Sequence, residues 1–218
     1  MSLFNGFKKK SIKSSESNKN KLPDAAEDFN TVLQAPADEV EQYYFENLVE
    51  FTLYAELYAK AKNKKVIWLK GDDYNNEYQR AFQLYNQGKY KDVIKVCKDS
   101  FKLNPIAISA RFEMCEAYLK LHNLKDAKRT LLEMKDFMAT ESLIARYYRR
   151  LGFVEIELGN YKTAAACYQY SQKFENHPSI AQELMYIISK AGKGVVSKIP
   201  EAVLEKSDLP VLIAKKTN

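Results

Sequence analysis

The chain has 218 residues, of which 46% are hydrophobic and 28% are charged, and its formal net charge is +6. This length and composition suit a soluble globular domain with its own core, and no run of about 18 apolar residues is present to span a membrane. The low numbers of glycines (7) and prolines (6) favour helices. The 3 cysteines are widely spaced, which argues against a disulfide framework or a zinc site.

The first segment, residues 1–37, is polar, and its charges are separated along the chain. Residues 1–22 carry six lysines and one glutamate, whereas residues 23–50 carry eight acids and no lysine or arginine. A segment with so few apolar side chains cannot bury enough surface to fold alone. We therefore expect residues 1–37 to form a disordered tail that is first basic and then acidic.

The next segment, residues 38–70, is predicted to be a helix followed by a connector. From Asp38 to about Lys62 the apolar spacing is helical, with acids early and lysines late, which complements the helix dipole. This helix is apolar over most of its circumference, so it must pack against the rest of the chain. Two placements of this helix stay open: it packs across or beside the partner-binding groove of the repeats, or it only caps the first hairpin. Residues 63–70 fit either a strand or a helical connector.

One phrase occurs three times within residues 71–177. "GKYKDVIKVCKDS" from Gly88 aligns with "HNLKDAKRTLLEM" from His122 and with "GNYKTAAACYQYS" from Gly159. Each phrase follows a run with helical apolar spacing, so each unit predicts a helix A, a tight turn and a helix B. Glycine in the turn suits the left-handed conformation that ends a helix.

These three units resemble the tetratricopeptide repeat (TPR) family. The family pattern has a small residue in the middle of helix A, and the matching residues are Ala81, Cys115 and Gly152. It has another small residue early in helix B, and the matching residues are Val93, Ala127 and Ala164. The resemblance implies an all-α fold, a right-handed superhelical solenoid of about three TPR helical hairpins in which neighbouring hairpins share one core.

The C-terminal part is predicted to close this array. Residues 178–192, "PSIAQELMYIISKAG", predict a capping helix with Ser179 as its N-cap and Gly192 as its stop. A cap is needed because the last repeat has only one neighbour. Residues 193–218 form a C-terminal tail, which is either packed on the helices or mobile.

The main functional prediction concerns the A helices. In the TPR family these helices line a concave groove that binds peptides or helices of partner proteins. By register, the groove residues in this chain are Tyr78, Phe82, Tyr85, Phe112, Glu116, Leu119, Arg146, Arg149 and Phe153. Aromatic side chains provide contact area at low entropic cost, and arginines suit carboxylates. The other interpretation, that these aromatics belong to the core, stays open.

No sequence pattern indicates catalysis. Cys97 and Cys115 fall at packing positions, and the two histidines, His122 and His177, are isolated from each other. We therefore expect no enzyme, no catalytic residues, no metal and no cofactor. Acids and bases are interspersed along the repeats, which argues against nucleic-acid binding.

These observations predict a non-enzymatic TPR scaffold or adaptor that binds a protein or peptide partner in the cytoplasm. The location is expected because no apolar segment of a secretory signal follows the N-terminal lysines. One alternative is a TPR-type secretion chaperone, although such chaperones are usually acidic. Another is a regulatory subunit held at a membrane surface by Phe4, Phe7 and the adjacent lysines. The sequence does not identify the partner or the oligomeric state.

Overall fold

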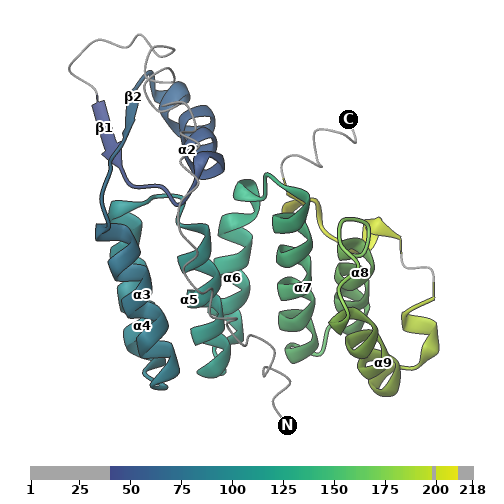
Figure 1. The fold of residues 1–218 in the computed structure, drawn as a ribbon. Helices are drawn as coiled ribbons and strands as arrows, with labels where there is room; N and C mark the ends of the chain where they lie inside the picture. Colours follow the sequence, from purple (N-terminus) through teal and green to yellow (C-terminus); the bar gives the residue numbers. More distant parts are fainter. Residues whose placement is uncertain (1–39, 198–199, 211–218) are drawn as a thin grey trace, which may run out of the picture. The chain divides into compact units, whose positions relative to one another are not determined.

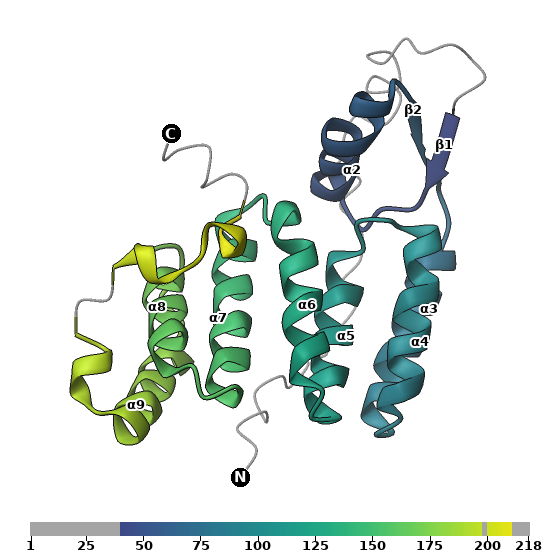
Figure 2. The ribbon, with the colours of Figure 1, turned by 180° about the vertical axis from the view of Figure 1, so that it is seen from behind.

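The computed structural model describes residues 40–197 and 200–210, which are predominantly helical (Figures 1 and 2). This part of the chain contains eight α-helices and one two-stranded sheet near its start. The helices pack on one another, as expected for an all-α fold. The predicted tail, residues 1–37, lies outside the described residues.

The described chain begins with a β–α–β unit, residues 40–68, which we call the N-terminal module. Strand β1 (Val40–Tyr43) pairs in parallel with strand β2 (Lys65–Trp68). Between them, helix α2 (Leu48–Tyr54) continues through a π-helical turn and a 3-10 turn, which span Ala55–Ala59 and Lys60–Lys62. Aromatic side chains from both strands and from α2 fill the space between these elements.

The prediction of one helix from Asp38 to Lys62 is wrong over its first part. The helix begins only at Leu48, where the Asn47 side chain caps it by accepting a hydrogen bond from the Glu50 N–H at 3.1 Å. The residues before it form a strand because their partner strand lies further along the chain, and periodicity within one segment carries no information about that pairing. Of the two conformations left open for residues 63–70, the structure has the strand.

Three helical hairpins follow the module, within the predicted range of residues 71–177. They are α3 (Asp73–Asn86) with α4 (Tyr90–Leu103), α5 (Ile108–Lys120) with α6 (Leu124–Met134), and α7 (Glu141–Glu157) with α8 (Tyr161–Ser171). The turn residues Gly88, His122 and Gly159 all have a left-handed backbone, with φ of 73°, 54° and 77°; this was predicted for the two glycines and not for His122. Consecutive hairpins are joined by contacts of α4 with α5 and of α6 with α7.

The small residues in the middle of the A helices lie at packed positions between helices. Ala81 is 1% exposed and Cys115 is 0% exposed, so both belong to the core between the helices. At Gly152 a Cβ atom would lie only 2.9 Å from the ring of Tyr168, a contact that side chains do not make. Glycine there allows α7 and α8 to pack closely.

The C-terminal residues pack onto the last hairpin. Helix α9 (Ser179–Ala191) contacts α8, and the buried Ile180 and Ile187 form a small core with it. Ser179 is the first helical residue and not the predicted N-cap, because the chain enters the helix through Pro178. Beyond α9, Leu204 is 4% exposed, so the described part of the tail has the packed arrangement of the two left open.

A buried carboxylate attaches the N-terminal module to the hairpins. The Glu50 side chain is 0% exposed. Its Oε1 accepts a hydrogen bond from the Ile108 N–H at 2.9 Å, and its Oε2 accepts one from Asn104 Nδ2 at 2.7 Å. Glu46 adds a second attachment, because its Oε1 accepts the Tyr74 hydroxyl at 2.6 Å. The module therefore contacts the helix ends where α3 and α5 begin.

Candidate partner-binding surface

We use the term helix-A face for the surface formed by Tyr78, Phe82 and Tyr85 on α3, Glu113, Glu116 and Leu119 on α5, and Arg146, Arg150 and Phe153 on α7. On α3 three aromatic residues follow one another at helical spacing. Phe82 is 39% exposed, whereas Tyr78 and Tyr85 are half-buried. Burial raises the pKa of both tyrosines to about 12, and nearby glutamates of α5 act in the same direction. These two rings therefore lie close to the acidic side chains of α5.

Charged residues of α5 and α7 form an acid–base cluster that consists of Glu113, Glu116, Arg146 and Arg150. Arg150 makes an ion pair with Glu116, and the two side chains are only 17% and 13% exposed. Burial raises the pKa of Glu113 and of Glu116, and the two arginines oppose this shift. The opposite charges of neighbouring A helices thus compensate each other in a partly shielded site.

The structure corrects the role predicted for Phe112. This ring is 1% exposed and belongs to the core, which is the alternative that the sequence left open. The Arg146 guanidinium carbon lies 4.0 Å from the ring centroid, in a cation–π contact. The surface at this position is therefore formed by Arg146, whose side chain is exposed.

The remaining predicted residues are divided between two places. Leu119 and Phe153 are half-buried on α5 and α7. Arg149, in contrast, makes an ion pair with Glu175 beyond the end of α8, with 2.9 Å between Nη1 and Oε2. Its partner Glu175 is not a member of the acid–base cluster, so the three neighbouring arginines do not act as one group.

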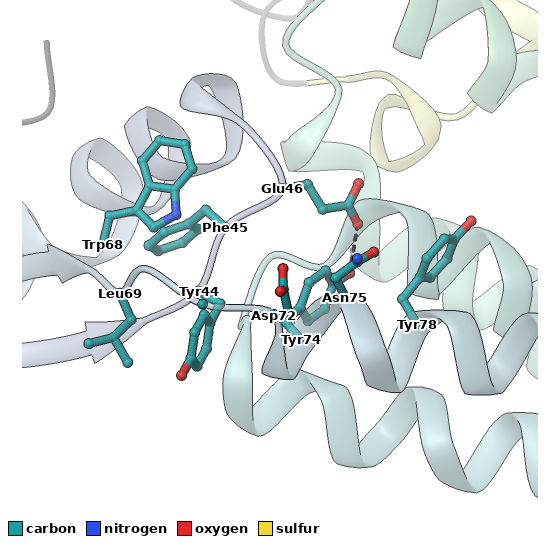
Figure 3. A pocket seen from close by; sticks show the side chains of 10 residues that line it. Tyr44, Phe45, Glu46, Trp68, Leu69, Asp72, Tyr74, Asn75 and Tyr78 are labelled. Carbon is teal, nitrogen blue, oxygen red and sulfur yellow. Dashed lines mark hydrogen bonds between the residues drawn. The ribbon is translucent and has the colours of Figure 1, made fainter. Parts of the chain in front are cut away.

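A second candidate site is a pocket between the N-terminal module and α3 (Figure 3), with a volume of about 350 Å³. Its lining residues are Tyr44, Phe45, Glu46, Trp68, Leu69, Gly71, Asp72, Tyr74, Asn75 and Tyr78. This pocket could not be predicted from the sequence, because its walls come from three separate segments. The signal that was present is the concentration of aromatic residues at 43–45 and at Trp68.

The cysteines give no sign of reactivity. Cys97, Cys115 and Cys167 are all buried. Burial raises the pKa of Cys97 and Cys115 to about 12, so both stay protonated at neutral pH.

Within residues 40–197 and 200–210, no group of three or more His, Cys, Asp or Glu residues is arranged to hold a metal ion. No helix in these ranges is long and apolar enough to cross a membrane.

A comparison with models of known protein families finds no match to this chain, and a comparison with curated proteins finds none either.

Proposed function

We propose that this chain is a non-enzymatic scaffold of the TPR type that binds a protein or peptide partner on its helix-A face. The repeated phrase supports the TPR assignment, because equivalent residues have equivalent roles in the three hairpins. The turn residues share one backbone conformation. Val93, Ala127 and Ala164 are each 0% exposed at the matching place in the B helices. In this proposal the hairpins continue one another as a right-handed superhelical solenoid.

The observation that carries the binding proposal is the placement of exposed aromatic surface beside the acid–base cluster. Phe82 is one of the few large apolar side chains that the described part of the chain leaves exposed. Partly desolvated aromatic residues and arginines account for most of the binding energy in protein interfaces. A partner would place an apolar side chain against Phe82 and charged groups against the cluster.

The test compares substitutions on and away from the helix-A face in the full-length chain. Partners are captured from a cell extract, identified by mass spectrometry and then titrated in purified form. We expect Phe82→Ala and Arg146→Gln each to weaken the partner's affinity by about tenfold or more. Met185→Ala is the matched control, since Met185 is 70% exposed on α9, away from the A helices.

Circular dichroism of each variant checks that the helical content is retained. A partner whose affinity is unchanged by Phe82→Ala and Arg146→Gln, but is reduced by Met185→Ala, would show that binding uses another surface. In that case the helix-A face would have no role in recognition.

A further inference from the structure

The pocket beside the N-terminal module has aromatic walls from three elements (Figure 3). Tyr44 and Phe45 follow β1, Trp68 ends β2, and Tyr74 and Tyr78 lie on α3. A volume of about 350 Å³ is within the range of roughly 300 to 1,000 Å³ that is usual for ligand pockets. The pocket is therefore large enough for one long side chain of a partner.

These aromatic walls are held in place by contacts behind them. The ring of Phe45 stands at 90° to that of Trp68, with centroids 6.1 Å apart. The ring of Trp68 also stacks on Phe51, with centroids 5.8 Å apart. On the opposite side, the Tyr74 hydroxyl donates a hydrogen bond to Glu46. A ligand therefore meets a preformed site, which reduces the entropic cost of binding.

The charged side chains that line the pocket are all acidic. Glu46 and Asp72 contribute carboxylates, and no lysine or arginine is among the lining residues. Within the described part of the chain, the Asp72 carboxylate has no hydrogen bond and no ion pair, and its side chain is exposed. The neighbouring Lys70 is exposed and does not line the pocket. The carboxylate of Asp72 is thus available to a cationic ligand.

We propose that this pocket binds the side chain of a lysine or arginine from a partner protein. The aliphatic stem would lie against the rings of Phe45 and Trp68, and the cationic head would reach Asp72. Aromatic faces and carboxylates both attract a cation, and the rings also favour the apolar stem. This proposal does not rest on the helix-A face, because the two surfaces share only Tyr78.

Trp68 allows a direct test, because it is the single tryptophan of the chain and it lines the pocket. The probes are acetylated and amidated tripeptides with alanine on both sides of a central lysine or arginine. Titration into the full-length protein at low salt is followed by tryptophan fluorescence. We expect the fluorescence to change saturably with the lysine and arginine probes. Their affinity should be at least about tenfold tighter than that of a probe with norleucine at the centre, and a probe with glutamate at the centre should give no response.

Two matched variants locate the interaction. Asp72→Asn removes the charge of this side chain without changing its size. We expect this variant to bind the lysine probe about fivefold or more weakly than the unchanged protein does. Asp92→Asn makes the same change on an exposed residue of α4, outside the pocket, and should leave the affinity unchanged. Equal binding of the norleucine probe, or an unchanged affinity of Asp72→Asn, would overturn the proposal.

The chain's own N-terminal lysines are the competing occupant. A full-length variant with Lys8, Lys9 and Lys10 replaced by glutamine distinguishes this case from a partner. We expect the affinity for the lysine probe to be the same as in the unchanged protein. A several-fold tighter affinity would mean that the N-terminal segment occupies the pocket, and would overturn the assignment to a partner.

Discussion

Three residues at equivalent places in the hairpins, Gly88, His122 and Gly159, have the same left-handed backbone. This conformation costs a non-glycine residue about 1–2 kcal/mol, because its Cβ approaches the carbonyl oxygen. A Cβ atom at Gly88 or Gly159 would meet no other heavy atom within 4 Å, so the cost of a side chain there is confined to the backbone. Only the second hairpin carries this strain.

Replacing His122 with glycine should therefore stabilise the protein. We expect the free energy of unfolding to rise by about 0.5–1 kcal/mol, since the relief of strain exceeds the extra entropy of glycine in the unfolded chain. Gly159→Ala introduces the same strain into the third hairpin and should lower the free energy by about 1 kcal/mol. Urea denaturation followed by circular dichroism measures both effects. A loss of stability in His122→Gly would contradict this account.

The sequence predicts part of the helix-A face but not how far each side chain is exposed. Register alone placed Phe112 on this face, whereas the structure covers its ring with Arg146. Register also gave no reason to include Glu113, which joins the acid–base cluster through its proximity to α7. Exposure depends on the rotamers and contacts of neighbouring helices, and a repeat pattern does not contain that information.

At the scale of elements, the three hairpins could be predicted because each is specified locally. A helical run, a turn residue and a second helical run lie next to one another in the sequence. The N-terminal module differs, because β1 forms only when β2 supplies its partner in the correct register. Its attachment through Glu50 also joins residues that are distant in sequence.

The Glu50 carboxylate is surrounded by donors, which makes it sensitive to a conservative change. Asn104 cannot reverse its amide to help, because its Oδ1 already accepts the Ile106 and Ala107 N–H groups at 3.1 and 3.0 Å. A glutamine at position 50 would direct its NH₂ group either at the NH₂ group of Asn104 or, with the amide reversed, at the Ile108 N–H, and both of these are donors. We expect Glu50→Gln to lower the free energy of unfolding by about 1–3 kcal/mol, as measured by urea denaturation.

Glu56→Gln is the matched control for this change. Glu56 belongs to the same helical segment, but its side chain is 60% exposed and pairs only with Lys60 across one turn. Such surface pairs contribute about 0.3–0.5 kcal/mol. If Glu50→Gln proves no more destabilising than Glu56→Gln, the buried carboxylate does not hold the module in place.

For the whole molecule, the buried carboxylates determine how stability should depend on pH. Burial raises the pKa of Glu113, Glu116 and Asp208 above the ordinary values of 4.5 for glutamate and 3.8 for aspartate. These residues are distributed from α5 to the tail. Above pH 4.5 the unfolded state loses these protons more readily than the folded state, so each raised pKa reduces stability at neutral pH relative to lower pH.

Acidification should therefore first stabilise this protein. As the pH falls from 7 towards 4.5, the folded state binds protons at these carboxylates before the unfolded state does, and the free energy of unfolding rises. Below about 4.5 both states are protonated and the gain ends. Glu41 then acts in the opposite direction: although burial opposes the shift, hydrogen bonds from Tyr54 and Lys64 lower its pKa, so its contribution is lost as the pH falls further.

We expect the urea midpoint to be higher at pH 5 than at pH 7, in 0.5 M NaCl to screen the net positive charge. Glu113→Gln removes one of the raised pKa values and should reduce this difference, whereas Glu56→Gln should not change it. The helical content at each pH is checked by circular dichroism. A midpoint that falls steadily from pH 7 to pH 5 would contradict this account, because it would mean that these carboxylates are better stabilised as anions than their burial implies.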